Sequence, residues 1–154
     1  MELSRNLKID SVARLWPAAA VAVEADRPVR DAVAALREHR VGCVLVTRHG
    51  RLVGLFTERD LLVRVLAAGL PLGAPLAECM TADPVTVEPK DSVRTALARM
   101  QAGGYRHLPV VGDDGRPTGI LSAKRIVRYL AEHFPATAYC QPPTADPPAR
   151  PEGA

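Results

Sequence analysis

The feature that most constrains this chain is an internal repeat. Residues 21–62 match residues 85–127, and the register slips by one residue where residues 48–50 meet residues 112–115. An insertion costs little in a hairpin turn, so the slip marks a turn in both copies. A repeat of this length predicts two copies of one structural unit packed against each other. Identical positions include Val21, Val23, Glu24, Val29, Arg30 and Ala32, matched by Val85, Val87, Glu88, Val93, Arg94 and Ala96.

Hydrophobic periodicity predicts the same order of elements in both copies: strand, helix, strand, strand, helix. Neither copy carries enough apolar residues for a core of its own, so we expect the two sheets to bury each other. In the first copy the expected elements are a strand at 21–23, a helix from Pro28, strands at 41–47 and 52–56, and a helix opening at Thr57. In the second copy we expect strands at 108–111 and 118–121 and a last helix from about Ala123.

Composition shifts outside the repeats define the remaining segments. The link between the copies contains Leu70, Leu72, Leu76 and Met80, and these apolar anchors predict an ordered crossover. The Pro-rich end has almost no large aliphatic residues and is expected to be disordered. The predicted segments are an N-terminal extension (1–14), a first repeat (15–68), a crossover (69–80), a second repeat (81–134) and a disordered tail (135–154).

Charge and composition limit the possible partners and compartments. The formal net charge is +3 and only 4% of residues are aromatic, which is weak support for nucleic-acid binding. The N-terminal residues lack the apolar region of a signal peptide, and no stretch approaches the roughly 20 apolar residues of a membrane span. We therefore expect a cytoplasmic protein without a membrane partner. Cys43, Cys79 and Cys140 have no metal-ligand spacing and are expected to be free thiols, Cys43 in the core.

Two motifs resemble those of the cystathionine-β-synthase (CBS) domain. Residues 80–122 read MTADPVTVEPKDSV…RHLPVV…GILS, and residues 42–62 read GCVLV…GRLVGLFTERDLL. The resemblance covers residues 15–132 and implies an α/β (α+β) fold in which two βαββα repeats pack as a pseudo-two-fold pair. It further implies a stand-alone regulatory pair that binds an adenosine-containing ligand (AMP, ADP, ATP or S-adenosylmethionine) between the repeats. Such pairs often form a disc-like homodimer and act on a protein partner.

The segment 54–60 is the strongest candidate site. Thr57 precedes a helix whose free N–H groups and dipole favour an anion, and the Asp60 carboxylate could accept hydrogen bonds from both hydroxyls of a ribose. The resemblance gives the two side chains these roles. The alternative is a capping box, in which Thr57 caps the helix and Asp60 only completes the cap.

The second copy departs from this pattern. Ser122 matches Thr57, but Arg125 stands in the place of Asp60, and a guanidinium cannot accept a hydrogen bond from a diol. We therefore expect unequal sites, with the second one empty or binding an anion through Lys124 and Arg125. Arg106 and His107 resemble the phosphate-facing positions of the family. The alternative for all four is a solvated surface.

No arrangement of nucleophile, base and orienting acid is recognisable, so we expect no enzymatic activity, no required cofactor and no metal site. The leading hypothesis is a nucleotide sensor. The competing one is a ligand-free module for protein interaction or dimerisation, suggested by Arg125 and by the apolar segment 41–43. The predicted ligand-binding residues are Val41, Gly42, Cys43, Thr57, Arg59, Asp60, Thr86, Arg106, His107, Ser122 and Lys124.

Overall fold

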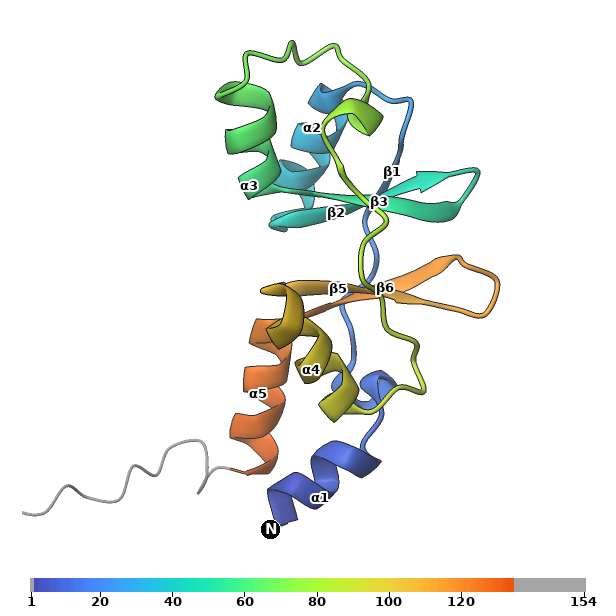
Figure 1. Cartoon of the computed structure of the whole chain (residues 1–154), viewed down its shortest axis with the longest axis vertical. Helices are drawn as coiled ribbons and strands as arrows, with labels where there is room; N and C mark the ends of the chain where they lie inside the picture. Colours follow the sequence, from blue (N-terminus) through green and yellow to red (C-terminus); the bar gives the residue numbers. More distant parts are fainter. Residues whose placement is uncertain (1, 135–154) are drawn as a thin grey trace, which may run out of the picture.

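The computed structural model describes residues 2–134, which form two similar halves stacked along the long axis of the molecule (Figure 1). This confirms the predicted fold of two βαββα repeats; the predicted disordered tail and Cys140 lie outside the described residues.

The first half contains β1 (Ala22–Glu24), α2 (Val29–His39), β2 (Cys43–Arg48), β3 (Arg51–Thr57), α3 (Glu58–Asp60) and the π-helical turn η2 (Leu61–Leu66). The second contains α4 (Val93–Gly103), β5 (His107–Val111), β6 (Pro117–Ser122) and α5 (Ala123–His133). Four short elements precede the halves: α1 (Glu2–Ile9), η1 (Val12–Leu15), η3 (Leu76–Glu78) and β4 (Thr81–Ala82).

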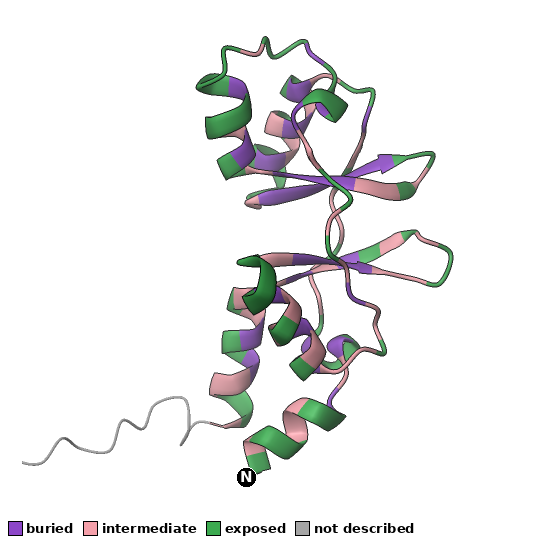
Figure 2. Ribbon diagram, viewed as in Figure 1, coloured by how far each residue is buried: buried purple, intermediate pink, exposed green. Residues whose placement is uncertain are grey.

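The two sheets face each other at the centre and the helices cover their outer faces (Figures 1 and 2). Side chains alternate along each strand, so Val44, Val46 and Phe56 point to the helices while Leu45 and Leu55 point to the other half. The two sheets do bury each other, but the expectation that neither copy has a core of its own is wrong. Each half has its own cluster of buried residues, because its helices cover one sheet face, and only a small third cluster lies between the sheets.

The segment that precedes each repeat packs into the core of the other half. Val12 and Leu15 are buried in the core of the second half, whereas Leu76 and Cys79 are buried in the core of the first. These positions correspond in the repeat, so the exchange is reciprocal. It places part of the predicted N-terminal extension and of the predicted crossover inside the cores.

Two matching glycines allow the exchanged segments to reach the sheets. β4 pairs with β3 at Gly54, and Ala18 forms a bridge with β6 beside Gly119. A Cβ atom at Gly54 would lie 2.9 Å from the carbonyl oxygen of Thr81, and one at Gly119 would lie 2.9 Å from that of Ala18. Both contacts are too short for any larger residue, so glycine is required at both places.

The first strand of the second repeat is shorter than predicted. In the first half, the Leu45 amide donates to the carbonyl of Val21 at 2.8 Å and helps to hold β1. The matching residue is Pro109, which has no N–H to donate to Val85. The strand is reduced to a bridge between Val87 and Val110.

The two hairpin turns touch at one side of the molecule. The Leu52 amide donates a hydrogen bond to the carbonyl of Gly115 at 3.2 Å, which joins the two halves near their turns. The opposite ends of both hairpins lie together on the other side (left in Figure 1). Among residues 2–134, no helix is long and apolar enough to cross a membrane.

The exchange predicts that a crossover residue stabilises the first half. Leu76 is fully buried, so Leu76→Ala should lower the free energy of unfolding by about 2–5 kcal/mol in urea titrations, through lost burial and a residual cavity. Leu72→Ala is the matched control in the same segment, because Leu72 is exposed; its effect should stay within about 0.5 kcal/mol. Equal effects of the two changes would contradict the packing.

Candidate functional site

Most of the predicted site residues lie at the ends of the two hairpins opposite their turns, here called the open ends. Cys43 lies opposite Thr57 in the β2–β3 pair, and the Glu58 amide donates to the Gly42 carbonyl at 3.1 Å. In the other half His107 lies opposite Ser122. Each hairpin thus presents one strand start and one helix start at the same end.

Thr57 and Asp60 form a reciprocal cap at the start of α3. The Asp60 amide donates to Oγ1 of Thr57 at 3.1 Å, while Oδ2 of Asp60 accepts from the Thr57 amide at 3.0 Å and from its hydroxyl at 3.1 Å. Both side chains therefore play the capping role that the sequence left open as the alternative. The cap fixes the orientation of the carboxylate of Asp60, a residue that is only 7% exposed.

Two further side chains hold the Asp60 carboxylate. The hydroxyl of Thr81, in β4, lies 3.3 Å from both carboxylate oxygens, and Nε of Arg64 lies 3.4 Å from Oδ1. Arg64 also donates to the Met80 carbonyl at 2.7 Å. Sequence reasoning missed Thr81 and Arg64, although the i, i+4 spacing from Asp60 to Arg64 was a usable signal.

The second open end has a cap without a carboxylate. Oγ of Ser122 accepts from the Arg125 amide at 3.2 Å, so Ser122 caps α5 as Thr57 caps α3. The Arg125 side chain occupies the position that matches Asp60, and Lys124 is exposed. The side chains at the two open ends therefore differ, and the predicted inequality in ligand binding stays a prediction.

Electrostatics connect the two ends. Burial lowers the pKa of His107, the neighbouring Arg106 lowers it further, and Glu58 of the first repeat opposes the shift. Glu58 thus lies close enough to His107 for its charge to act across the boundary between the halves. It was absent from the predicted set.

The Cys43 thiol is not suited to chemistry. It is buried, as predicted, and burial together with the charge of Asp60 raises its pKa to about 12. A thiol with such a pKa stays protonated near neutral pH and is neither a nucleophile nor a metal ligand. In the described part of the chain, no group of three His, Cys, Asp or Glu residues could hold a metal ion.

Three predicted residues take no part in the contacts described at the two open ends. Arg59 and Lys124 are exposed, and within residues 2–134 their side chains form no hydrogen bond or ion pair. Thr86 is half-buried, and its carbonyl accepts from Arg99 at 2.7 Å. Their roles stay predictions.

A hollow of about 590 Å³ lies beside the first open end. It includes Val41 and Gly42 of the predicted set but neither Thr57 nor Asp60. Its basic rim comes from Arg37 and Arg40 at the end of α2. The lining residues are Val33, Leu36, Arg37, Arg40, Val41, Gly42, Glu58 and Leu61.

Comparisons with known proteins give one family. The model described as "CBS domain" matches residues 18–67 and 76–132. The CBS domain-containing protein YhcV of Bacillus subtilis is 30% identical over 100 residues, which are 65% of this chain and 71% of YhcV. A 17.7 kDa protein of Acidianus ambivalens is 31% identical over 105 residues. The chain spans 63% of that protein and 48% of a relative from Methanopyrus kandleri.

Solved structures of CBS-domain proteins share the fold. One from Agrobacterium tumefaciens has a TM-score of 0.70 and 30% identity, covering 78% of this chain and 98% of its own. One from Pyrobaculum aerophilum, complexed with AMP, has a TM-score of 0.70 and 27% identity, covering 80% of this chain and 99% of its own.

The environment of His107 predicts a pH-dependent contribution to stability. Its pKa is below the unfolded value of about 6.5, so the unfolded chain binds more protons as the pH falls through that value. The free energy of unfolding should therefore decrease as the pH falls from about 7.5 to about 5. His107→Gln should make this decrease smaller, as measured by urea titrations at the two pH values.

His39→Gln provides the control, because His39 is an exposed residue at the end of α2. It should leave the difference in unfolding free energy between the two pH values close to that of the unchanged protein. An identical pH dependence in the His107 variant and the unchanged protein would contradict the assignment.

Proposed function

The chain belongs to the CBS-domain family, and on that premise we propose that it is a regulatory module that binds an adenosine-containing nucleotide beside Asp60. The observation that carries the proposal is the orientation of this carboxylate. Its oxygens are fixed by the cap at one side, while their contacts to Thr81 and Arg64, at 3.3–3.4 Å, are longer. A ribose diol can replace these longer contacts with two hydrogen bonds.

The surrounding groups suit the rest of a nucleotide. The backbone at Gly42 and Cys43 provides a charge-free edge for the base, and Arg106 provides a cation for phosphate from the other repeat, with His107 beside it as a neutral side chain because its pKa is lowered. Arg59, Thr86, Ser122 and Lys124 belong to the same proposed set. AMP in the Pyrobaculum relative supports this ligand class.

We propose a regulatory rather than a catalytic role in the cytoplasm, with no required cofactor. A ligand that contacts Asp60 in one repeat and Arg106 in the other binds best at one angle between the halves. It therefore shifts their relative orientation by its differential affinity. A protein partner would sense that shift.

Calorimetry with AMP tests the proposal. The unchanged chain should bind one AMP per chain. Asp60→Asn should weaken binding at least about tenfold, because it removes a charged acceptor of the ribose hydroxyls. Asp91→Asn is the control and should leave the affinity for AMP unchanged. Asp91 also accepts hydrogen bonds, from the Glu88 amide at 2.9 Å and from Arg99 at 3.0 Å, but it lies near the start of α4.

Arg125→Asp tests the inequality of the two ends. It adds a carboxylate one turn after the Ser122 cap and should raise the stoichiometry toward two AMP per chain. No heat of binding from AMP, ADP, ATP or S-adenosylmethionine at about millimolar concentration would overturn the proposal.

We propose further that the chain forms a homodimer through the outer helices. Leu62, Val63 and Leu66 on η2 are 58–61% exposed, and Val127 on α5 is 64% exposed. Val127 matches Leu62 in the repeat, so both halves present an apolar position on the same helix. Two such surfaces on a pseudo-two-fold chain can meet their counterparts in a second copy.

Sedimentation tests the dimer. Leu66→Glu should shift the chain from dimer to monomer, because burying an unpaired carboxylate in an interface is costly. Leu72→Glu is the control, since Leu72 is exposed in the crossover and outside the outer helices. A monomeric unchanged chain, or a dimer that both variants retain, would contradict this interface.

A further inference from the structure

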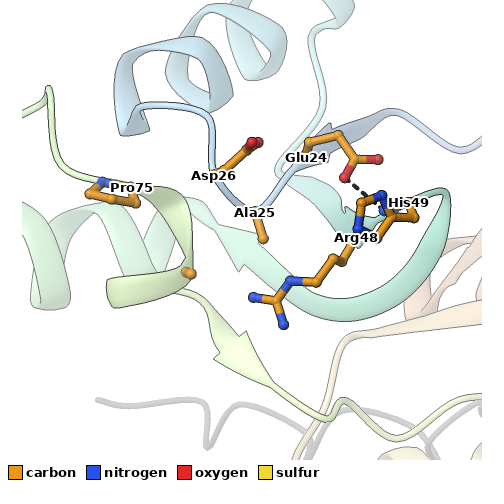
Figure 3. A pocket seen from close by; sticks show the side chains of 7 residues that line it. Glu24, Ala25, Asp26, Arg48, His49 and Pro75 are labelled. Atoms are coloured by element: carbon orange, nitrogen blue, oxygen red, sulfur yellow. Dashed lines mark hydrogen bonds between the residues drawn. The ribbon is translucent and has the colours of Figure 1, made fainter.

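A second hollow, of about 330 Å³, lies at the hairpin-turn end of the first repeat, away from Asp60. Figure 3 shows acidic and basic side chains around it, from the end of β1 and the residues after it and from the end of β2 and the turn that follows. Small apolar residues complete its wall. The lining residues are Glu24, Ala25, Asp26, Arg48, His49, Pro75 and Ala77.

Glu24 is the fixed anion of this hollow. Its carboxylate accepts from the Thr47 hydroxyl at 2.9 Å and from the amides of His49 and Gly50 at 3.0 and 3.2 Å. These bonds, that of Thr47 first, lower the pKa of Glu24. The carboxylate is therefore held in place and ionised at neutral pH.

Asp26 and Arg48 are charged groups without partners. Both are exposed, and within residues 2–134 neither side chain forms an ion pair or hydrogen bond. Side chains of opposite charge that line one hollow usually form an ion pair when their charged groups are within reach of each other. Here no ion pair forms between them in the described part of the chain, so the hollow keeps an acidic and a basic position.

The second repeat is an internal comparison. Lys90 occupies the position of Asp26, whereas Gly112 occupies that of Arg48. Nζ of Lys90 lies 2.9 Å from Oε2 of Glu88 and 3.8 Å from Oδ1 of Asp113. The second repeat thus has no base at the position of Arg48 and its lysine is paired with acids, whereas Asp26 and Arg48 form no ion pair within the described part of the first repeat.

We propose that the hollow in the first repeat binds a small zwitterion, an α-amino acid. The ammonium group lies beside Asp26 and the remaining acceptor capacity of Glu24, and the carboxylate binds the Arg48 guanidinium. The exposed residues Pro75 and Ala77 contact the side chain of the ligand. Because the charges are exposed to solvent, the affinity is roughly millimolar.

Backbone amide NMR of the full chain tests this site with L-leucine as the probe. Leucine should shift the amides of Ala25, His49 and Ala77. Two analogues each lack one charge: 4-methylpentanoate has no ammonium, and 3-methylbutylamine has no carboxylate. Each should bind at least about tenfold more weakly than leucine.

Arg48→Gln and Asp26→Asn should each weaken leucine binding about tenfold. Arg51→Gln is the matched control, because Arg51 lies on the other side of the turn and outside the lining; it should bind leucine unchanged. All three variants should retain the affinity for AMP, which separates this site from the proposed nucleotide site. No shift by about 50 mM leucine, or equal binding of leucine and 4-methylpentanoate, would overturn the proposal.

Discussion

The reciprocal exchange of the segments before each repeat is the packing on which the rest of the structure depends. Val12 and Leu15 complete the core of the second half, and Leu76 and Cys79 complete that of the first. Neither half can separate from the other without opening its own core, because some of its buried residues belong to the segment that leads into the other repeat. The small cluster between the sheets, around Leu45, can therefore stay small without loss of the two-fold arrangement.

The same exchange brings the crossover to the candidate site. Thr81 reaches the Asp60 carboxylate because β4 pairs with β3, and Gly54 leaves room for that pairing. A carboxylate that caps one helix thus also holds the segment leading into the other repeat. A ligand that replaces the contact between Asp60 and Thr81 would act directly on that segment. Binding in the first repeat could in this way change the position of the second repeat.

Local pattern was enough to predict both repeats, because alternation in the strands and the helical face after Pro28 are properties of neighbouring residues. The exchange was not predicted, since nothing near Val12 in the sequence says which core it enters. The shortened strand depends on one missing N–H at Pro109 opposite Val85, a pairing known only in three dimensions. At the site, the spacing of Thr57 and Asp60 predicted both a cap and a ligand contact; the structure confirms the cap, and the ligand stays a prediction.

Matching positions that differ in charge explain why two similar repeats need not bind alike. Asp60 is matched by Arg125, and Asp26 is matched by Lys90, although Thr57 and Ser122 cap the following helices in the same way. The hydrogen bond from Leu52 to Gly115 joins the two halves near the hairpin turns, whereas the charge of Glu58 acts on His107 across the boundary at the opposite ends of the hairpins. Binding beside Asp60 would therefore act where charged groups of the two repeats meet, whereas binding beside Asp26 would act near the joined turns.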